Sequence, residues 1–149
     1  MDIFSNDVFA FLKALYIRKV EYILVGGFAV NYYRHPRATG DLDLWLKDTE
    51  ENRKKLIQAF GDVGVENLES LMIMPLLAGY SEIMLNNGFY IYLMADLKSI
   101  KQEQFDECLS SASNFNLEDI IIKVLHKNTL IEEKKLLGRS KDLDDVENL

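Results

Sequence analysis

The sequence predicts an α+β fold, in which a small mixed β-sheet is flanked by helices. Residues 22–25 form a short apolar run that is typical of a buried strand. Residues 41–46 place a leucine at every second position, which is the period of a strand. Two further strands, 81–85 and 89–94, are separated by an Asn-Asn-Gly turn, and Asn-Gly is the strongest short signal for a hairpin.

Three helices are predicted in the first half of the chain. The first covers residues 7–18, and the second covers residues 28–34, directly after a pair of glycines. A third helix ends at residue 60, and Asp48 or Thr49 caps its N-terminus because a short polar side chain can accept a hydrogen bond from the first turn.

Three more helices are predicted after residue 100, and one ambiguous segment precedes them. Residues 66–80 are ambiguous between a short helix and a loop, and a helix is predicted over residues 103–109. Asn116 caps a predicted helix over residues 117–126, Asn128 and Gly138 then interrupt the chain, and the last predicted helix covers residues 142–149.

Length and composition predict one domain over residues 1–149, with a core at about 20–100 and a helical part at about 101–149. Apolar residues make up 48% of the chain, which is enough to build a hydrophobic core. No run approaches the roughly 20 apolar residues that cross a bilayer, and the N-terminus lacks the basic start of a secretory signal. The chain has one cysteine and so forms no internal disulfide. We therefore expect a cytoplasmic protein without membrane partners.

The net charge of −7 argues against binding to extended nucleic acid, because a polynucleotide-binding protein usually carries a basic surface. Lysine and arginine do cluster at residues 53–55 and 134–135, and both clusters are predicted to lie on solvated helix faces. A small nucleotide suits this charge distribution better than a long strand.

The glycine pair and two aspartates carry the clearest functional signal. Gly26 and Gly27 stand between the first predicted strand and a helix, where free backbone N–H groups and the helix dipole favour a phosphate. Asp41 and Asp43 project from one face of their strand, roughly 7 Å apart at about 3.3 Å per residue. Carboxylates at this spacing can hold Mg²⁺, with Mn²⁺ as an alternative, together with the phosphates of a substrate.

This order of strand, glycines, helix and Asp-x-Asp strand resembles the DNA polymerase β-like nucleotidyltransferase superfamily. The segments 25–30 and 37–45 look like its small stand-alone bacterial branch, which is related to toxin–antitoxin nucleotidyltransferases. The resemblance implies a polymerase β-like core and Mg²⁺-dependent transfer of a nucleoside monophosphate from an NTP to a hydroxyl acceptor, with release of pyrophosphate. It does not identify the acceptor, which is a small molecule, an RNA end or a protein. Arg37 precedes the carboxylate strand and is predicted to contact bound phosphate.

A second resemblance covers the C-terminal third of the chain. Residues 117–123 and 138–145 look like the closing segments of the same small nucleotidyltransferases, in which a lysine approaches the phosphates. Lys123 falls on that position, and its alternative role is that of a solvated lysine. Asp142 falls in the second segment, where capping of the last helix is the preferred interpretation.

The family also supplies a third carboxylate from a later strand, and here the sequence departs from the pattern. Tyr92 occupies that position by the match of residues 91–100, and Asp96 follows four residues later. Asp96 would lie on the same face of the strand if the strand continued, and it is the candidate for a third catalytic carboxylate beside Asp41 and Asp43.

Two classes of function therefore remain open from the sequence. The first is an active nucleotidyltransferase, which the intact aspartate pair favours. The second is a catalytically impaired nucleotide-binding or antitoxin-like protein of a toxin–antitoxin module, with a protein partner from a neighbouring gene. Tyr92 at the third carboxylate position favours the second class.

Overall fold

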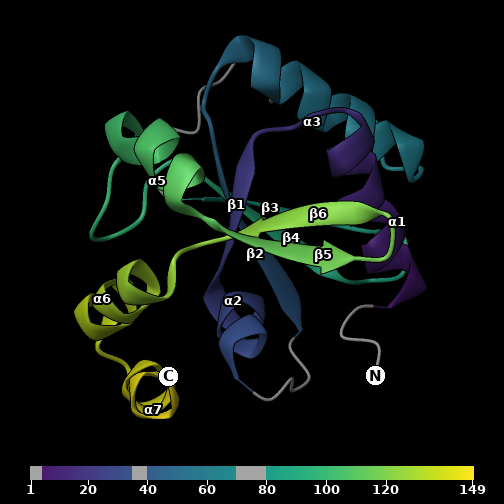
Figure 1. Ribbon diagram of the computed structural model, residues 1–149. Helices are drawn as coiled ribbons and strands as arrows, with labels where there is room; N and C mark the ends of the chain where they lie inside the picture. Colours follow the sequence, from purple (N-terminus) through teal and green to yellow (C-terminus); the bar gives the residue numbers. More distant parts are fainter. Residues whose placement is uncertain (1–4, 35–39, 70–79) are drawn as a thin grey trace.

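The computed structural model describes residues 5–34, 40–69 and 80–149. Six strands form one mixed sheet in the order β3-β4-β2-β1-β6-β5 (Figure 1). This arrangement of helices around a mixed sheet confirms the predicted α+β fold. The strands are β1 (Tyr22–Val25), β2 (Asp41–Leu46), β3 (Tyr80–Met84), β4 (Tyr90–Met94), β5 (Ser113–Leu117) and β6 (Ile120–Val124).

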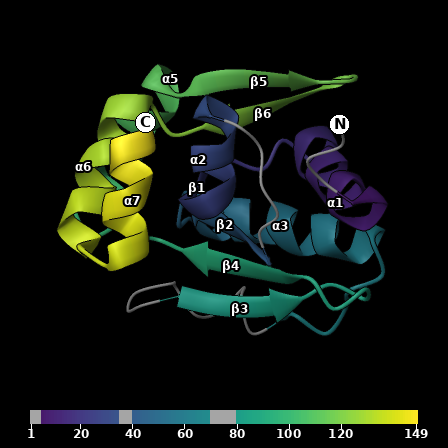
Figure 2. The ribbon, with the colours of Figure 1, turned by 90° about the horizontal axis from the view of Figure 1, so that it is seen from below.

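The helices lie at the ends and on the faces of this sheet (Figure 2). Within the described ranges, no helix is long and apolar enough to cross a membrane. The helical elements are α1 (Asn6–Ile17), α2 (Gly26–Tyr33), α3 (Glu50–Asp62), the 3₁₀ turn η1 (Gln102–Gln104), α5 (Phe105–Ser111), α6 (Lys127–Leu137) and α7 (Ser140–Asn148).

The antiparallel pair of β1 and β2 positions the glycines beside the aspartates. Val25 lies opposite Asp43 in this pair, so the last residue of β1 lies beside the first residues of β2. Helix α2 begins at this end of the strands, whereas α3 follows β2 at the opposite end (Figure 1). The glycines and the aspartates, which are separate in sequence, therefore lie side by side.

Caps and aromatic contacts fix the helices on the sheet. Thr49 accepts a hydrogen bond from the backbone N–H of Asn52 at 3.1 Å, which confirms it as the cap of α3. Phe11 of α1 packs against Phe60 of α3, with ring centroids 4.5 Å apart. Trp45 of β2 is fully buried and meets α5 through an edge-to-face contact with a second aromatic ring.

The predicted hairpin forms between β3 and β4, but its turn differs from a two-residue Asn-Gly turn. The backbone N–H of Gly88 donates to the carbonyl of Leu85 at 2.9 Å, and Gly88 has a φ of 88°. Asn87, by contrast, does not have a positive φ. Only the glycine uses the left-handed region, as in a hairpin built on a type I turn followed by a bulge.

The helix predicted over residues 117–126 is wrong, because this segment belongs to a hairpin of β5 and β6. Strand β6 is rich in β-branched residues and buries every second side chain, which is the pattern of a strand. It pairs in parallel with β1, at Leu24 and Val124, and so extends the central sheet. Glu118, with a φ of 52°, lies in the turn of the hairpin.

Residues 101–149, which were predicted to form a helical part, therefore also contain strands β5 and β6. Helix α6, which is missing from the prediction, begins at Lys127 and includes Asn128, so Asn128 does not interrupt the chain. Gly138 does end α6, with a φ of 66° that favours glycine. Residues 70–79, within the ambiguous segment 66–80, lie outside the described residues.

Candidate nucleotide site

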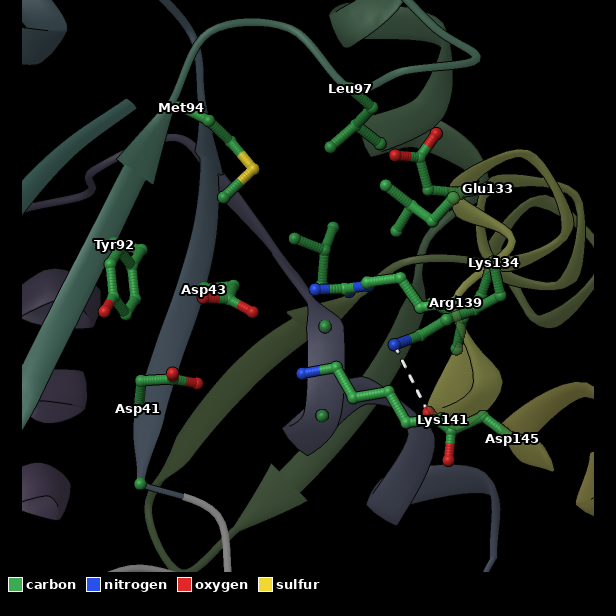
Figure 3. A pocket seen from close by; sticks show the side chains of 16 residues that line it. Asp41, Asp43, Tyr92, Met94, Leu97, Glu133, Lys134, Arg139, Lys141 and Asp145 are labelled. Atoms are coloured by element: carbon green, nitrogen blue, oxygen red, sulfur yellow. Dashed lines mark ion pairs between the residues drawn. The ribbon is translucent and has the colours of Figure 1, made fainter. Parts of the chain in front are cut away.

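A cavity of about 560 Å³ opens where the glycines meet the aspartates (Figure 3). One wall is formed by β2 and β4, the floor by the junction of β1 and α2, and the facing wall by α6 and α7. The residues that line it include Gly26, Gly27, Asp41, Asp43, Tyr92, Met94, Leu97, Leu130, Glu133, Lys134, Leu137, Arg139, Lys141 and Asp145.

Gly26 allows the helix to begin directly beside a carboxylate. Its φ is 71°, and a Cβ at this position would overlap Oδ2 of Asp43. Any side chain would therefore collide with Asp43 as well as strain the backbone. Gly27 follows in the first turn of α2 and also lines the cavity. This geometry leaves the N-terminus of α2, with its backbone N–H groups, next to the aspartates.

Asp41 and Asp43 form a carboxylate pair on the cavity wall, as their alternation in the sequence predicted. Burial first, and then the charge of Asp41, raise the pKa of Asp43 from 3.8 to about 7. Lys134, Lys141 and Arg139 partly oppose this rise. The pair therefore concentrates negative charge that a cation would relieve. Oxygen ligands of this kind suit Mg²⁺ or Mn²⁺, with the remaining ligands supplied by phosphate and water.

The facing wall carries three cations: Lys134, Arg139 and Lys141. Lys141 is exposed, and with Arg139 it extends toward the carboxylates (Figure 3). Lys134 is only 5% exposed, so its predicted place on a solvated helix face is wrong. The facing wall can therefore contact an anion held at the carboxylate wall.

A buried network of charges joins α6 to α7 beneath this cationic wall. Nζ of Lys134 lies 3.2 Å from Oδ1 of Asp142 and 3.3 Å from Oδ2 of Asp145. Arg34, at the end of α2, lies 3.3 Å from Oδ1 of Asp145. Burial raises the pKa of Asp142, but hydrogen bonds from Arg139 and Lys134 outweigh it and hold this pKa below its ordinary value. The network fixes α6 and α7 against the cavity.

Asp142 also caps α7, as predicted. Its Oδ2 accepts a hydrogen bond from the backbone N–H of Arg139 at 3.3 Å, so it acts as the third helical residue of a capping box. Asp142 is fully buried and does not line the cavity.

Tyr92 lies on the carboxylate wall. It pairs in register with Asp43 across the parallel strands β2 and β4, so both side chains project from the same face of the sheet. Figure 3 shows its ring beside Asp43, on the side of the cavity away from the cations. The sequence match placed Tyr92 where the superfamily has its third carboxylate, and the structure brings it next to the aspartate pair.

Asp96 lies outside the cavity. Strand β4 ends at Met94, so the condition that would have kept Asp96 on the cavity face is not met. Asp96 is exposed, and its Oδ1 accepts a hydrogen bond from the backbone N–H of Gln102 at 2.7 Å, at the start of η1. The structure therefore gives Asp96 a capping role and does not bring it to Asp41 and Asp43.

Lys123 is also placed away from the aspartates. It lies on β6, donates from Nζ to Oδ1 of Asn114 at 2.6 Å, and lines a different cavity beside Tyr22. Its predicted contact with phosphate came from the resemblance of residues 117–123 to small nucleotidyltransferases, and the structure places this lysine at the other cavity. Arg37, the other predicted phosphate contact, lies outside the described residues.

Two further carboxylates line the cavity, and both have other partners. Glu133 accepts hydrogen bonds from the backbone N–H groups of Lys98 and Ser99 at 2.9 and 2.7 Å, which ties α6 to the loop after β4. Asp145 belongs to the buried network. Across the residues that the structure describes, no group of three or more His, Cys, Asp or Glu side chains could hold a metal. Asp41 and Asp43, which project from one face of β2 into the cavity, are the candidate protein ligands for a cation there.

The contribution of α6 to the cationic wall is the part of the site that sequence reasoning missed. A signal existed in α6, because Leu130, Glu133, Lys134 and Leu137 are spaced as neighbours on one helix face, and all four line the cavity. That signal required the helix itself to be predicted.

Comparison with known proteins agrees with this fold. No protein-family model matches the sequence, and comparison with curated proteins gives no match. The crystal structure of a "putative nucleotidyltransferase" from Thermotoga maritima aligns over 95% of this chain and 91% of that chain, with a TM-score of 0.57 and 16% identity. The chain therefore has the fold of a small nucleotidyltransferase, and the resemblance seen in the sequence is confirmed at the level of fold.

Proposed function

We propose that this protein is a nucleotidyltransferase that moves a nucleoside monophosphate from an NTP to a hydroxyl acceptor and releases pyrophosphate. One observation carries the proposal: the cavity brings a glycine-initiated helix, a carboxylate pair and three cations to a common space. This combination matches the charges of a metal–triphosphate complex, in which the metal needs oxygen ligands and the phosphates need donors and cations.

Each wall of the cavity has a role in this proposal. Asp41 and Asp43 would hold Mg²⁺ or Mn²⁺, which when bound would neutralise phosphate charge and orient the reacting phosphate. The backbone N–H groups at Gly26 and Gly27 would donate to phosphate oxygens. The cations of α6 and α7 would stabilise the negative charge of the leaving pyrophosphate, because positioning and electrostatics supply most of the catalysis in this chemistry.

A second candidate function is a nucleotide-binding protein with impaired catalysis, such as the antitoxin-like partner in a two-gene module. Tyr92 favours it, because a neutral phenol in register with Asp43 is a poorer metal ligand and base than a carboxylate. Both candidates require the nucleotide site, and they differ in whether an external acceptor receives a nucleotide.

Calorimetric titration with each NTP, with Mg²⁺ or with EDTA, tests the nucleotide site. Wild-type protein is expected to bind an NTP in a metal-dependent manner, and Asp41→Asn and Asp43→Asn are expected to abolish this dependence. Asp96→Asn is the matched control, since Asp96 is an exposed aspartate outside the cavity. Equal, metal-dependent binding by all four proteins would refute the site.

Incubation with labelled NTPs and Mg²⁺ then separates the two candidates. Label transferred to RNA, an amino sugar or another protein supports the enzyme. NTP binding without transfer to any acceptor, together with co-purification of a protein from a neighbouring gene, supports the interaction protein.

A further inference from the structure

The position of Tyr92 indicates a role other than that of a metal ligand in place of a carboxylate. It is in register with Asp43 on the adjacent parallel strand, at the usual strand separation of about 4.8 Å. It lines the cavity and is half-buried, so its side chain is reachable from the space that the nucleotide would fill. Figure 3 shows the ring beside Asp41 and Asp43, on the side of the cavity away from the cations of α6 and α7.

The side chain of Tyr92 carries a hydroxyl where a carboxylate would otherwise be. Tyrosine places this oxygen at the far end of a rigid ring, further from the strand than the oxygens of an aspartate at the same position. A phosphate held at the aspartate pair would therefore have this hydroxyl on one side and the cations of α6 and α7 on the other. A hydroxyl is the group that nucleotidyl transfer consumes.

We propose that Tyr92 is itself an acceptor, so that the protein attaches a nucleoside monophosphate to its own tyrosine. This inference rests on the proposed function and names one acceptor for it. The phenolic oxygen attacks the α-phosphorus of the NTP, the bond from that phosphorus to the bridging oxygen breaks, and pyrophosphate leaves. The phenolic proton passes to solvent, and the product is a tyrosine phosphodiester.

Proximity supports this step more strongly than the acidity of the phenol does. A hydroxyl held beside the reacting phosphate converts a bimolecular reaction into an intramolecular one, with effective concentrations that reach about 10⁵ M or more. The attached nucleotide would remain in the cavity, so a modified protein would be blocked for a second NTP.

Tyr90 provides a matched control on the same strand. It lies two residues before Tyr92, in register with Asp41, and the two tyrosine rings stack with centroids 6.5 Å apart. Tyr90 is 40% exposed and does not line the cavity. Removing its hydroxyl is therefore expected to leave the reaction unchanged.

Intact-mass spectrometry of the full chain after incubation with each NTP and Mg²⁺ tests the proposal. Wild-type protein and Tyr90→Phe are expected to gain the mass of one nucleoside monophosphate, and fragmentation is expected to locate it on Tyr92. Tyr92→Phe and Asp43→Asn are expected to gain nothing. The rate of the gain should not depend on protein concentration, because the acceptor lies in the protein's own cavity.

The other outcomes overturn the proposal in distinguishable ways. Equal labelling of Tyr92→Phe, or a rate that rises with protein concentration, would refute Tyr92 as the intramolecular acceptor. An unlabelled wild-type protein that binds NTP and labels an external acceptor would refute this inference alone. Absence of metal-dependent NTP binding in the calorimetric titration would refute the proposed function, and this inference with it.

Discussion

Replacing Asp43 with asparagine is expected to stabilise the metal-free protein while it removes the function. The pKa of Asp43 rises from 3.8 to about 7 in the folded chain, because of burial and the nearby charge of Asp41. At a pH above 7 the folded protein must hold this carboxylate ionised in a place that disfavours the charge. The amide introduced by Asp43→Asn has nearly the same shape as the carboxylate and carries no charge.

The magnitude follows from linkage between protonation and folding. The unfolded chain releases the proton near pH 3.8 and the folded chain near pH 7, so the ionised carboxylate destabilises the folded state fully above pH 7. At about 1.4 kcal/mol per pKa unit, the upper limit of this effect is about 4 kcal/mol. As the pH falls from 7 toward 3.8, the folded state takes up the proton and the cost disappears.

Urea unfolding in EDTA at a series of pH values measures this difference. Asp43→Asn should be more stable than wild type by about 2 to 4 kcal/mol at pH 8, with a difference that shrinks steadily toward pH 4. Addition of NTP and Mg²⁺ should stabilise wild type but not the variant, because only wild type binds the ligand. A variant less stable than wild type at pH 8, or an advantage that does not change with pH, would show that the ionised Asp43 carboxylate does not destabilise the folded state. Asp96→Asn should show no such pH-dependent gain.

Three further substitutions test other parts of the site. Lys134→Met should lower the free energy of unfolding by about 3 to 5 kcal/mol, because it leaves buried carboxylates without their partner. Lys135→Met, on the exposed side of α6, should change this free energy little. Equal urea midpoints for the two variants would contradict the buried network. Gly27→Val should abolish NTP binding in calorimetry while circular dichroism stays native, and normal binding would place the phosphate elsewhere. Tyr92→Asp should raise pyrophosphate release with an external acceptor at least about tenfold, because general-base assistance is typically worth about 10²- to 10⁴-fold, while Asp96→Ala should change it little. The reverse pattern would mean that Asp96 reaches the reacting groups.

The local parts of this fold could be predicted from the sequence. Strands β1 and β2, the helix between them and the cap at Thr49 depend on patterns within a few residues, and the structure confirms them. The hairpin of β3 and β4 is also confirmed, although Gly88 alone takes the left-handed conformation. Local propensity and burial agree in these segments, so no distant contact is needed to choose between alternatives.

The segment 117–126 shows why the rest could not be predicted. Its run of isoleucines suits a buried helix or a buried strand, and periodicity cannot separate the two over so few residues. The choice depends on pairing of β6 with β1, which lies far away in the chain. Because the prediction makes that strand a helix, it misses α6, and with it the place of Lys134 in the cationic wall.

The residues of the candidate site also differ in whether local sequence alone could predict their positions. Gly26, Gly27 and the aspartate pair follow from a short motif, and the structure gathers them around one cavity. The positions of Asp96 and Lys123 depend on where β4 ends and on which element residue 123 belongs to, and local sequence does not fix either. The predicted exposure of Lys134 is wrong because its burial arises only when α7 packs on α6.

The proposed function requires a nucleotide to bind in the cavity between the aspartate pair and the C-terminal helices. Amide-resolved NMR during titration with ATP and Mg²⁺ tests it most directly, since glycine amides are sensitive reporters of bound phosphate. A nucleotide bound there should cause the largest shifts at Gly26, Gly27 and Asp43, with smaller shifts at Lys141 and none at Lys123, which lines the other cavity. Shifts centred on Lys123 with Gly26 and Gly27 unmoved would contradict it.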